Sequence, residues 1–303
     1  AKRSETVTTA SENHEAQRAY WDGAGGDKWI RRAADVDINV APAQAAAIEA
    51  ADIRAGARVL DIGCGCGGST LAIAERAGAG GRVIGVDISQ AMIAQARRVS
   101  SDTSNVEFRV ADASRDDFGE ARFDRMFSRF GVMFFGDPPS AFAHLRGALK
   151  PDSKLVFVCW RTVVENPWMY LPFNAVCKHA PRPPRPGPED PGPFSFAAPE
   201  RVTRILTQAG FAAPEFAKFD WDMDLALGRG LDAAVESAAT IGPASAALTD
   251  QPPEVRAAAI AQLMGRLFGR QRACLAVVLA CAILTYGGVS LFVVGFSAYP
   301  LAV

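Results

Sequence analysis

The sequence is poor in the residues that build disulfide frameworks, metal clusters and strongly charged surfaces. It holds six cysteines and three histidines in 303 residues. That is too few cysteines for a secreted disulfide scaffold, and His14, His144 and His179 are too scattered to form a metal cluster. Lysine plus arginine (32) balances aspartate plus glutamate (33), so no bulk charge attracts nucleic acid. We therefore expect a cytoplasmic protein with no metal and no nucleic-acid partner.

Charge is also absent from the end of the chain, because no charged residue follows Arg272. Residues 273–303 are long and apolar enough to span a bilayer, and three arginines precede them, as at a cytoplasmic flank. The same stretch can instead supply the last strand of a sheet, after a turn at residues 287–288. A final strand is favoured over a membrane anchor, and a frameshifted end is the third interpretation.

From residue 41 to residue 165 the sequence alternates regularly between short Val- and Ile-rich runs and Ala-rich runs of helical period. The expected strands are 57–63, 81–89, 106–112, 123–130 and 154–161, and the expected helices are 42–53, 69–77, 90–100 and 140–150. Strands that alternate with helices pair in parallel. The pattern therefore predicts an α/β fold with a doubly wound, mostly parallel, Rossmann-like sheet.

The chain divides into four expected parts. These are an N-terminal helical cap, the Rossmann-like core, an insertion that forms a lid, and the apolar tail, at residues 1–40, 41–165, 166–272 and 273–303. Within the insertion, residues 181–193 contain seven prolines, which exclude a helix or a central strand. A helix at 198–211, a strand at 215–225 and further Ala-rich helices follow this loop.

The first expected strand runs into the glycine-rich stretch DIGCGCGGST, residues 61–70. Cys64 and Cys66 lack the second ligand pair that a zinc site needs. A P-loop is excluded too, because no Lys-Ser/Thr closes the glycine run. The glycines match the G-x-G-x-x-G pattern of dinucleotide sites, but a single match of this kind is a weak signal.

Acidic residues follow three neighbouring strands of the predicted sheet. Asp61, Asp87 and Asp112 end the first, second and third strands, and the carboxyl ends of parallel strands meet at one edge. Asp61 would repel a pyrophosphate and attract an ammonium group. Asp87 suits ribose hydroxyls, Asp112 suits the exocyclic amine of adenine, and Met92 can lie against a flat ring. The pattern indicates a ligand with an amine, a ribose and an adenine, and without phosphate.

These stretches together resemble the class I S-adenosylmethionine-dependent methyltransferases. The resemblance rests on DIGCGCGGST, VIGVDIS, VADAS, FDRMFSRFGVMFF and LKPDSKLVFVCWR, and it is strongest for the small-molecule group that includes the ubiquinone/menaquinone-type enzymes. It implies S-adenosyl-L-methionine as cofactor and S-adenosyl-L-homocysteine as product. It also implies a seven-stranded sheet whose last, antiparallel strand inserts between strands five and six. One departure is Asp152-Ser153, where the family has Gly-Gly, and we expect only a local adjustment there.

The resemblance also implies roles for individual residues. Gly63 and Gly65 would let the backbone approach the methionine part of the cofactor, and Asp61 would orient its amino group. Asp87 would bind the ribose. The remaining cofactor-binding residues would be Ile88 and Met92 on the adenine faces, Asp112 and Ala113 at its edge, and Ser128 on the methionine side.

Three aromatic stretches can form the pocket for the methyl acceptor. They contribute Tyr20, Trp21, Trp29, Phe130, Met133, Trp160, Asn166 and Trp168. Such aromatic density suits a small, hydrophobic or aromatic acceptor, methylated at oxygen or carbon. A catalytic base is not evident: His179, Arg129 and Arg161 are weak candidates, and His144 is expected to be structural.

Two other functions stay open on the sequence. One is an NAD(P)-dependent oxidoreductase, which Asp61 and Asp112 disfavour. The other is a non-catalytic cofactor-binding protein tethered to a membrane through residues 273–303. The sequence does not indicate the oligomeric state.

Overall fold

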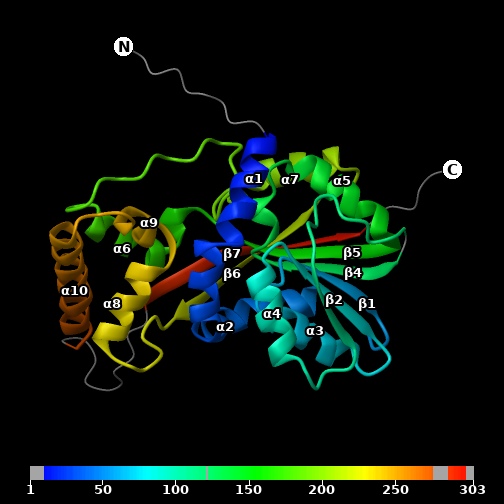
Figure 1. The fold of residues 1–303 in the computed structure, drawn as a ribbon, viewed down its shortest axis with the longest axis horizontal. Coiled ribbons are helices and arrows are strands. Elements are labelled where there is room, and N and C mark those ends of the chain that lie inside the picture. Colours follow the sequence, from blue (N-terminus) through cyan, green and yellow to red (C-terminus); the bar gives the residue numbers. More distant parts are fainter. Residues whose placement is uncertain (1–9, 121, 276–285, 298–303) are drawn as a thin grey trace, which may run out of the picture.

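A seven-stranded sheet lies between two layers of helices, with a helical lobe at one end (Figure 1). The computed structural model describes residues 10–120, 122–275 and 286–297. The strands are β1 (Arg58–Ile62), β2 (Arg82–Asp87), β3 (Val106–Val110), β4 (Phe123–Arg129), β5 (Leu149–Trp160), β6 (Glu215–Met223) and β7 (Tyr286–Ser297). The helices are α1 (Ala10–Trp21), α2 (Ala24–Ala50), α3 (Gly68–Ala77), α4 (Gln90–Val99), α5 (Pro138–Ala148), α6 (Pro167–Val176), α7 (Pro199–Gln208), α8 (Leu231–Thr240), α9 (Gly242–Leu248) and α10 (Pro253–Leu275), with the short 3₁₀ turns η1 (Val132–Phe134) and η2 (Val163–Glu165).

The strand order is β3-β2-β1-β4-β5-β7-β6, and β1 to β5 pair in parallel. The predicted doubly wound sheet is therefore confirmed, and each predicted core strand appears. The strand predicted at 154–161 begins earlier, at Leu149, because the helix predicted at 140–150 ends at Ala148. The chain runs outward in one direction from β1 and in the other from β4. The crevice between their carboxyl ends is the switch point at which open α/β sheets bind ligands.

The apolar tail supplies β7, which pairs antiparallel with both β5 and β6. Gly287 and Gly288 lie inside this strand, which begins with the pairing of Tyr286 with Met223. The turn expected at these glycines is therefore wrong, because glycine adopts an extended backbone as readily as a turn. No helix in the described ranges is long and apolar enough to cross a membrane. Residues 276–285 and 298–303 of the predicted segment lie outside those ranges.

The helix expected at 42–53 is one part of the longer helix α2, which runs unbroken through Pro42. An internal proline removes a hydrogen bond and costs about 3 kcal/mol or more. Burial of an apolar stripe that includes Val40, Ala43 and Ala47 offsets that cost, because α2 packs against α3, α4 and three strands. The helix crosses the boundary predicted at residue 40, so cap and core share one rigid element.

The insertion forms the helical lobe at the left of Figure 1, where α6, α8, α9 and α10 pack on one another. Residues 181–193 contain neither helix nor strand, as predicted, and Gly192 N donates to Met133 O at the carboxyl edge of the sheet. The departure from Gly-Gly is a local adjustment: Asp152 adopts φ 58°, the left-handed conformation that glycine would favour.

Candidate functional site

The glycine loop connects β1 to α3 at the switch point. Gly63 and Gly65 have φ values of 66° and 55°, which L-residues rarely adopt. A Cβ on Gly63 would lie 2.7 Å from Gly131 Cα in the turn after β4. Gly63 is thus required for contact between the two loops that border the crevice, which is a different reason from the predicted approach to a ligand.

Asp61 is buried at the end of β1, under the first turn of α3. Its Oδ2 accepts hydrogen bonds from Ser69 Oγ (2.7 Å) and Thr70 Oγ1 (2.6 Å). Its Oδ1 is buried and has no hydrogen-bond partner in the part of the chain that the structure describes. Burial raises the pKa of Asp61 to about 6, against the opposing effects of these hydroxyls and of Arg129. A buried carboxylate with an unpaired oxygen is costly unless a ligand donates to it.

Asp87 ends β2 and holds the glycine loop in place. Its Oδ2 accepts from Gly65 N and its Oδ1 from Ser89 N, both at 2.9 Å. Each carboxylate oxygen has further lone pairs for ligand hydroxyls. Burial raises the pKa of Asp87 as well. Ile88 follows at the same edge and is half-buried.

Asp112 follows β3 and is surrounded by partners. Its Oδ1 accepts from Ser114 N and Oγ, and its Oδ2 lies 2.7 Å from Arg115 Nε and 3.0 Å from His14 Nε2. His14 comes from α1, a partner that the sequence analysis did not foresee. Ala113, next along the chain, is buried.

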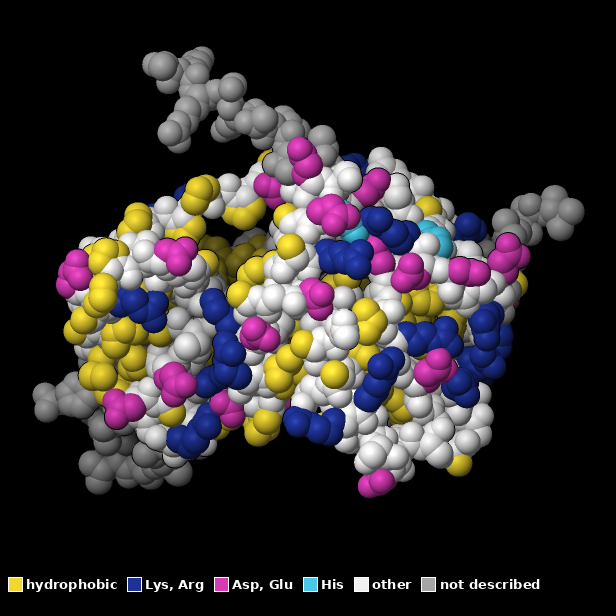
Figure 2. All heavy atoms as spheres, viewed as in Figure 1, with side chains coloured by type: hydrophobic (Ala, Val, Ile, Leu, Met, Phe, Trp, Pro, Cys, Tyr) yellow, Lys and Arg dark blue, Asp and Glu magenta, His cyan; other side chains and the backbone are white. Residues whose placement is uncertain are grey.

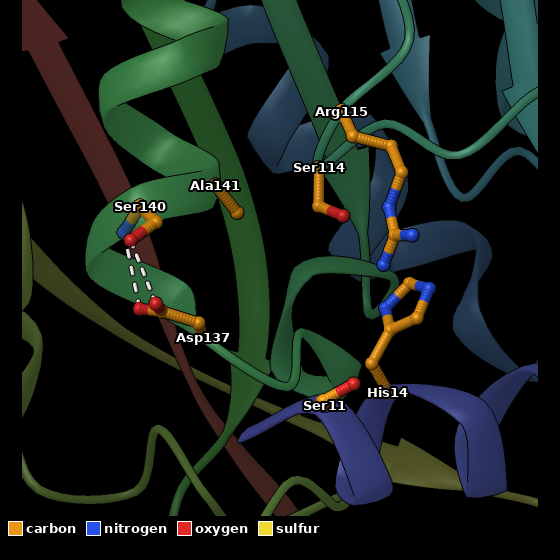
Figure 3. Close-up of a pocket in the computed structure, with 7 residues that line it drawn as sticks. All are labelled: Ser11, His14, Ser114, Arg115, Asp137, Ser140 and Ala141. Carbon is orange, nitrogen blue, oxygen red and sulfur yellow. Dashed lines mark hydrogen bonds between the residues drawn. The ribbon is translucent and has the colours of Figure 1, made fainter.

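A cavity of about 270 Å³ opens beside Asp112, between α1 and the start of α5. In Figure 3, His14 and Arg115 point toward one another on one side, and Asp137 bonds Ser140 on the other. The side chains that line it are polar except for Ala141.

Ser128, predicted to line the methionine side, instead joins the two loops. It is buried, and its Oγ donates to Ile62 O (2.8 Å) and accepts from Gly131 N and Val132 N. These bonds use the hydroxyl's donor and acceptor capacity. Ser128 therefore holds together the two loops that border the crevice, and its contact with the cofactor stays a prediction.

Helix α2 covers the glycine loop. A Cβ on Gly65 would lie 3.4 Å from Trp29 Nε1 and 3.7 Å from Met92 Sδ, so both predicted side chains lie beside this loop. Trp21 packs edge-on against Trp29 and against Phe134 in η1, with ring centroids 6.1 Å and 4.9 Å apart. Tyr20 contacts Trp21 and is half exposed. The aromatic cap thus spans from the β1 loop to the β4 loop.

The other predicted pocket residues are buried and pack largely on each other. Phe130 stacks on Trp160 with centroids 4.1 Å apart, and Trp160 contacts Trp168 at 5.5 Å. Phe130 has φ 65°, a strained conformation for an aromatic residue. Trp168 Nε1 is buried without a hydrogen-bond partner among the described residues. These side chains and Met133 form a wall behind the crevice, while Asn166 donates to backbone carbonyls of residues 161 and 162.

The structure places two of the weak candidates for acid–base or anion chemistry, Arg161 and His179, in other surroundings than the crevice. Arg161 is ion-paired with Glu165 and Asp220, so its charge is used within the fold. His179 is exposed in the turn beyond α6. The ten residues of α6 span about 15 Å, which separates His179 from Trp168 at the start of that helix. His144 bonds the Asp116 carbonyl, as expected of a structural residue.

Arg129, the third weak candidate, lies at the crevice. It donates to Asp37 Oδ1 (2.6 Å) and Gln44 Oε1 (2.7 Å), both on α2. Asp37 and Gln44 were not predicted. Their position on an amphipathic helix looks like that of ordinary surface residues, and only the folding of α2 across the edge brings them to β4.

Cys64 and Cys66 in the glycine loop are free thiols. Burial raises the pKa of Cys64 well above its ordinary value and that of Cys66 to about 11. In the described ranges, no group of three or more His, Cys, Asp or Glu side chains is placed to hold a metal ion.

Comparison with known proteins agrees with this geometry. Residues 59–152 match the family described as "Methyltransferase domain". Phosphoethanolamine N-methyltransferase 1 of Triticum aestivum is 34% identical over 110 residues, which are 36% of this chain and 22% of that protein. Aklanonic acid methyltransferase DauC of Streptomyces sp. (strain C5) is 35% identical over 104 residues, 34% of this chain and 47% of that protein. These matches thus span less than half of either relative.

A solved structure shares the fold over most of the chain. The putative methyltransferase from an antibiotic biosynthesis pathway of Anabaena variabilis ATCC 29413 superposes with a TM-score of 0.59. That match has 17% identity and covers 83% of this chain and 96% of the other. The fold is therefore that of the class I methyltransferases. With the match over residues 59–152, this chain carries a methyltransferase domain of the class I, S-adenosylmethionine-dependent type.

Proposed function

We propose that this protein transfers a methyl group from S-adenosylmethionine to a small, hydrophobic or aromatic acceptor. The observation that carries the proposal is the buried Asp61 Oδ1, which has no hydrogen-bond partner among the described residues, at the switch point of the sheet. The cofactor has an ammonium group that would satisfy this oxygen, and ionic hydrogen bonds in buried sites are the strong ones.

The neighbouring residues fit the rest of the cofactor. Asp87, already bonded to Gly65 N, would take the ribose hydroxyls. Ile88 and Met92 would flank the adenine, and Asp112 with Ala113 would hold its edge. No phosphate is required, which agrees with the acidic character of all three strand ends.

The cofactor supplies a methyl group already activated on sulfur, so the chain's task is to orient the two reactants and exclude water. The acceptor, after losing its proton to solvent, would form a bond to the methyl carbon as the carbon–sulfur bond breaks, and S-adenosylhomocysteine would be left. Neither His144, which bonds the Asp116 carbonyl, nor His179, which is exposed beyond α6, is placed to take a proton from the acceptor. An acceptor that is acidic enough to ionise near neutral pH, such as the enol of a 1,3-dicarbonyl or a phenol activated by a neighbouring carbonyl, therefore fits this site best, with methylation at oxygen or carbon.

The acceptor would enter beside the helical lobe. Figure 2 shows a hollow floored by hydrophobic side chains between α1 and the lobe of α6 and α9. The wall of Phe130, Trp160 and Trp168 is apolar, and Trp168 keeps an indole N–H without an acceptor among the described residues. An aromatic molecule that carries oxygen would suit such a surface.

The oxidoreductase alternative has less support. Dinucleotide sites place the pyrophosphate at the start of the helix after the glycine loop. Here Asp37 lies at that point: a Cβ on Gly68, the first residue of α3, would be 2.4 Å from Asp37 Oδ2. A carboxylate in this position repels phosphate.

Calorimetric titration tests the proposal. We expect micromolar binding of S-adenosylhomocysteine and no binding of NAD(H). Release of S-adenosylhomocysteine is then measured with phenolic and enolic polyketide-like acceptors and with phosphoethanolamine. Turnover of phosphoethanolamine alone would refute the hydrophobic acceptor, and binding of NAD(H) alone would refute the methyltransferase.

A further inference from the structure

Arg129 is a buried cation at the carboxyl end of β4. Its side chain is 7% exposed, and its ionic partner among the described residues is Asp37, whose side chain is 36% exposed. The neutral Gln44 accepts a second hydrogen bond. Both partners come from α2, so the ion pair joins the helix that covers the crevice to a strand that forms it.

Asp37 is directed at the glycine loop and not at solvent alone. One of its oxygens bonds Arg129, and the other lies over Gly68 at the start of α3. Its charge also contributes, after burial, to the raised pKa of Cys66 within the loop. A negative charge is favourable at the start of a helix. The chain therefore places its own carboxylate between Arg129 and the first residue of α3.

Arg129 also acts on Asp61, whose pKa it lowers against the larger effect of burial. Asp61 ends β1 and Arg129 ends the adjacent β4, so an anion with an unpaired oxygen and a cation lie on the same side of the crevice. The amino-acid end of S-adenosylmethionine carries an ammonium and a carboxylate on one carbon. Asp61 and Arg129 complement these two charges.

We propose that Arg129 binds the carboxylate of the cofactor, and that Asp37 competes with this carboxylate for the Arg129 guanidinium. The inference rests on the proposed function. Binding exchanges one Arg129–carboxylate ion pair for another, and no proton is transferred. The released Asp37 faces solvent on α2, so the exchange also loosens the helix that covers the loop.

The test compares two ligands that differ only in the carboxylate: S-adenosylhomocysteine and its decarboxylated amine, S-adenosyl-3-thiopropylamine. Calorimetry measures both dissociation constants for each variant. Arg129→Gln weakens S-adenosylhomocysteine binding at least tenfold and changes amine binding less than twofold. Asp37→Asn strengthens S-adenosylhomocysteine binding three- to tenfold, and it produces no gain when combined with Arg129→Gln.

Arg161→Gln is the matched control, because Arg161 is another buried arginine paired with two acids outside the crevice. It should change neither dissociation constant. If Arg129→Gln does not fold, as judged by thermal melting, Arg129→Lys replaces it and should weaken the carboxylate ligand selectively, since lysine lacks the planar fork.

If the Arg129 variant loses the same affinity for both ligands, Arg129 only holds α2 in place, and its assignment to the carboxylate is overturned. Weaker binding of S-adenosylhomocysteine by Asp37→Asn would overturn the proposal that Asp37 competes with the ligand carboxylate. If the wild-type protein binds neither ligand, the proposed function fails and this assignment with it. A wild-type protein that binds both with similar affinity overturns the Arg129 assignment alone.

Discussion

Asp61 at the end of β1 and Asp112 after β3 are both acids at strand ends, but the fold surrounds them differently. Asp61 is fully buried and keeps one oxygen unpaired among the described residues. Asp112 also has an oxygen without a hydrogen bond, but that oxygen lies within ion-pair distance of Arg115 and His14, and its other oxygen bonds Ser114. Asp61 therefore depends on a ligand for a partner to its second oxygen, whereas His14 of α1 already contacts Asp112. Binding energy should therefore be concentrated at the Asp61 end.

The largest loss of cofactor affinity is expected from Asp61→Asn. The amide offers the cofactor ammonium either a competing N–H donor or an oxygen without a negative charge. Loss of a buried ionic hydrogen bond should weaken S-adenosylhomocysteine binding by about 3 kcal/mol, more than 100-fold. Calorimetry measures this. An affinity within fivefold of wild type would remove Asp61 from the site.

The same variant should be more stable than wild type at pH 7.5. The folded-state pKa of Asp61, about 6, lies above its ordinary value of 3.8. The ionised form is therefore disfavoured by folding, and stability falls as pH rises through 6. Asn removes that cost, so the melting temperature rises at pH 7.5 and the gain shrinks on acidification. A lower melting temperature at every pH would contradict this account.

Asp87→Ala is expected to weaken S-adenosylhomocysteine binding by about 2 kcal/mol, through loss of the ribose bonds and of the grip on Gly65. Asp124→Ala is the control, because Asp124 is bonded to Lys150 and to Arg58 N, near the amino ends of the strands. Equal losses in both variants would indicate general destabilisation.

Lowering the pH should weaken binding about tenfold between pH 7.5 and pH 5, since Asp61 takes up a proton near its pKa of about 6 and loses its charge. Asp87, whose pKa is also raised, acts in the same direction. Titrations across this range should show a loss in wild type and a flatter profile in Asp61→Asn. Tighter binding at pH 5 would reverse the assigned charges.

The smallest effect is expected at the other end of the edge. Asp112→Asn should cost about 1 kcal/mol, because Asn keeps an acceptor oxygen for adenine. His14→Ala should leave affinity unchanged or improve it slightly by freeing Asp112. Should Asp112→Asn cost as much as Asp61→Asn, the two ends would be equivalent and the comparison would fail.

Much of the core was predictable because it is encoded locally. Short Val-rich runs must be buried, and acids placed at their ends converge once the strands pair in parallel. The loop-joining hydrogen bonds of Ser128 were not predicted, because a serine at the end of a strand does not show that two loops share its hydroxyl. The extent of α2 was underestimated, because Pro42 is a local signal that long-range packing overrides.

By itself, the sequence determined the alternating α/β core, the glycine turn and the acids at the strand ends, since each depends on residues close together in the chain. Only the tertiary structure decided which of those acids has an ion-pair partner, and which helix covers them. His14 lies 98 positions from Asp112, and Asp37 lies 92 from Arg129. No local pattern specifies such pairs, because they form only when α1 and α2 fold across the carboxyl edge of the sheet.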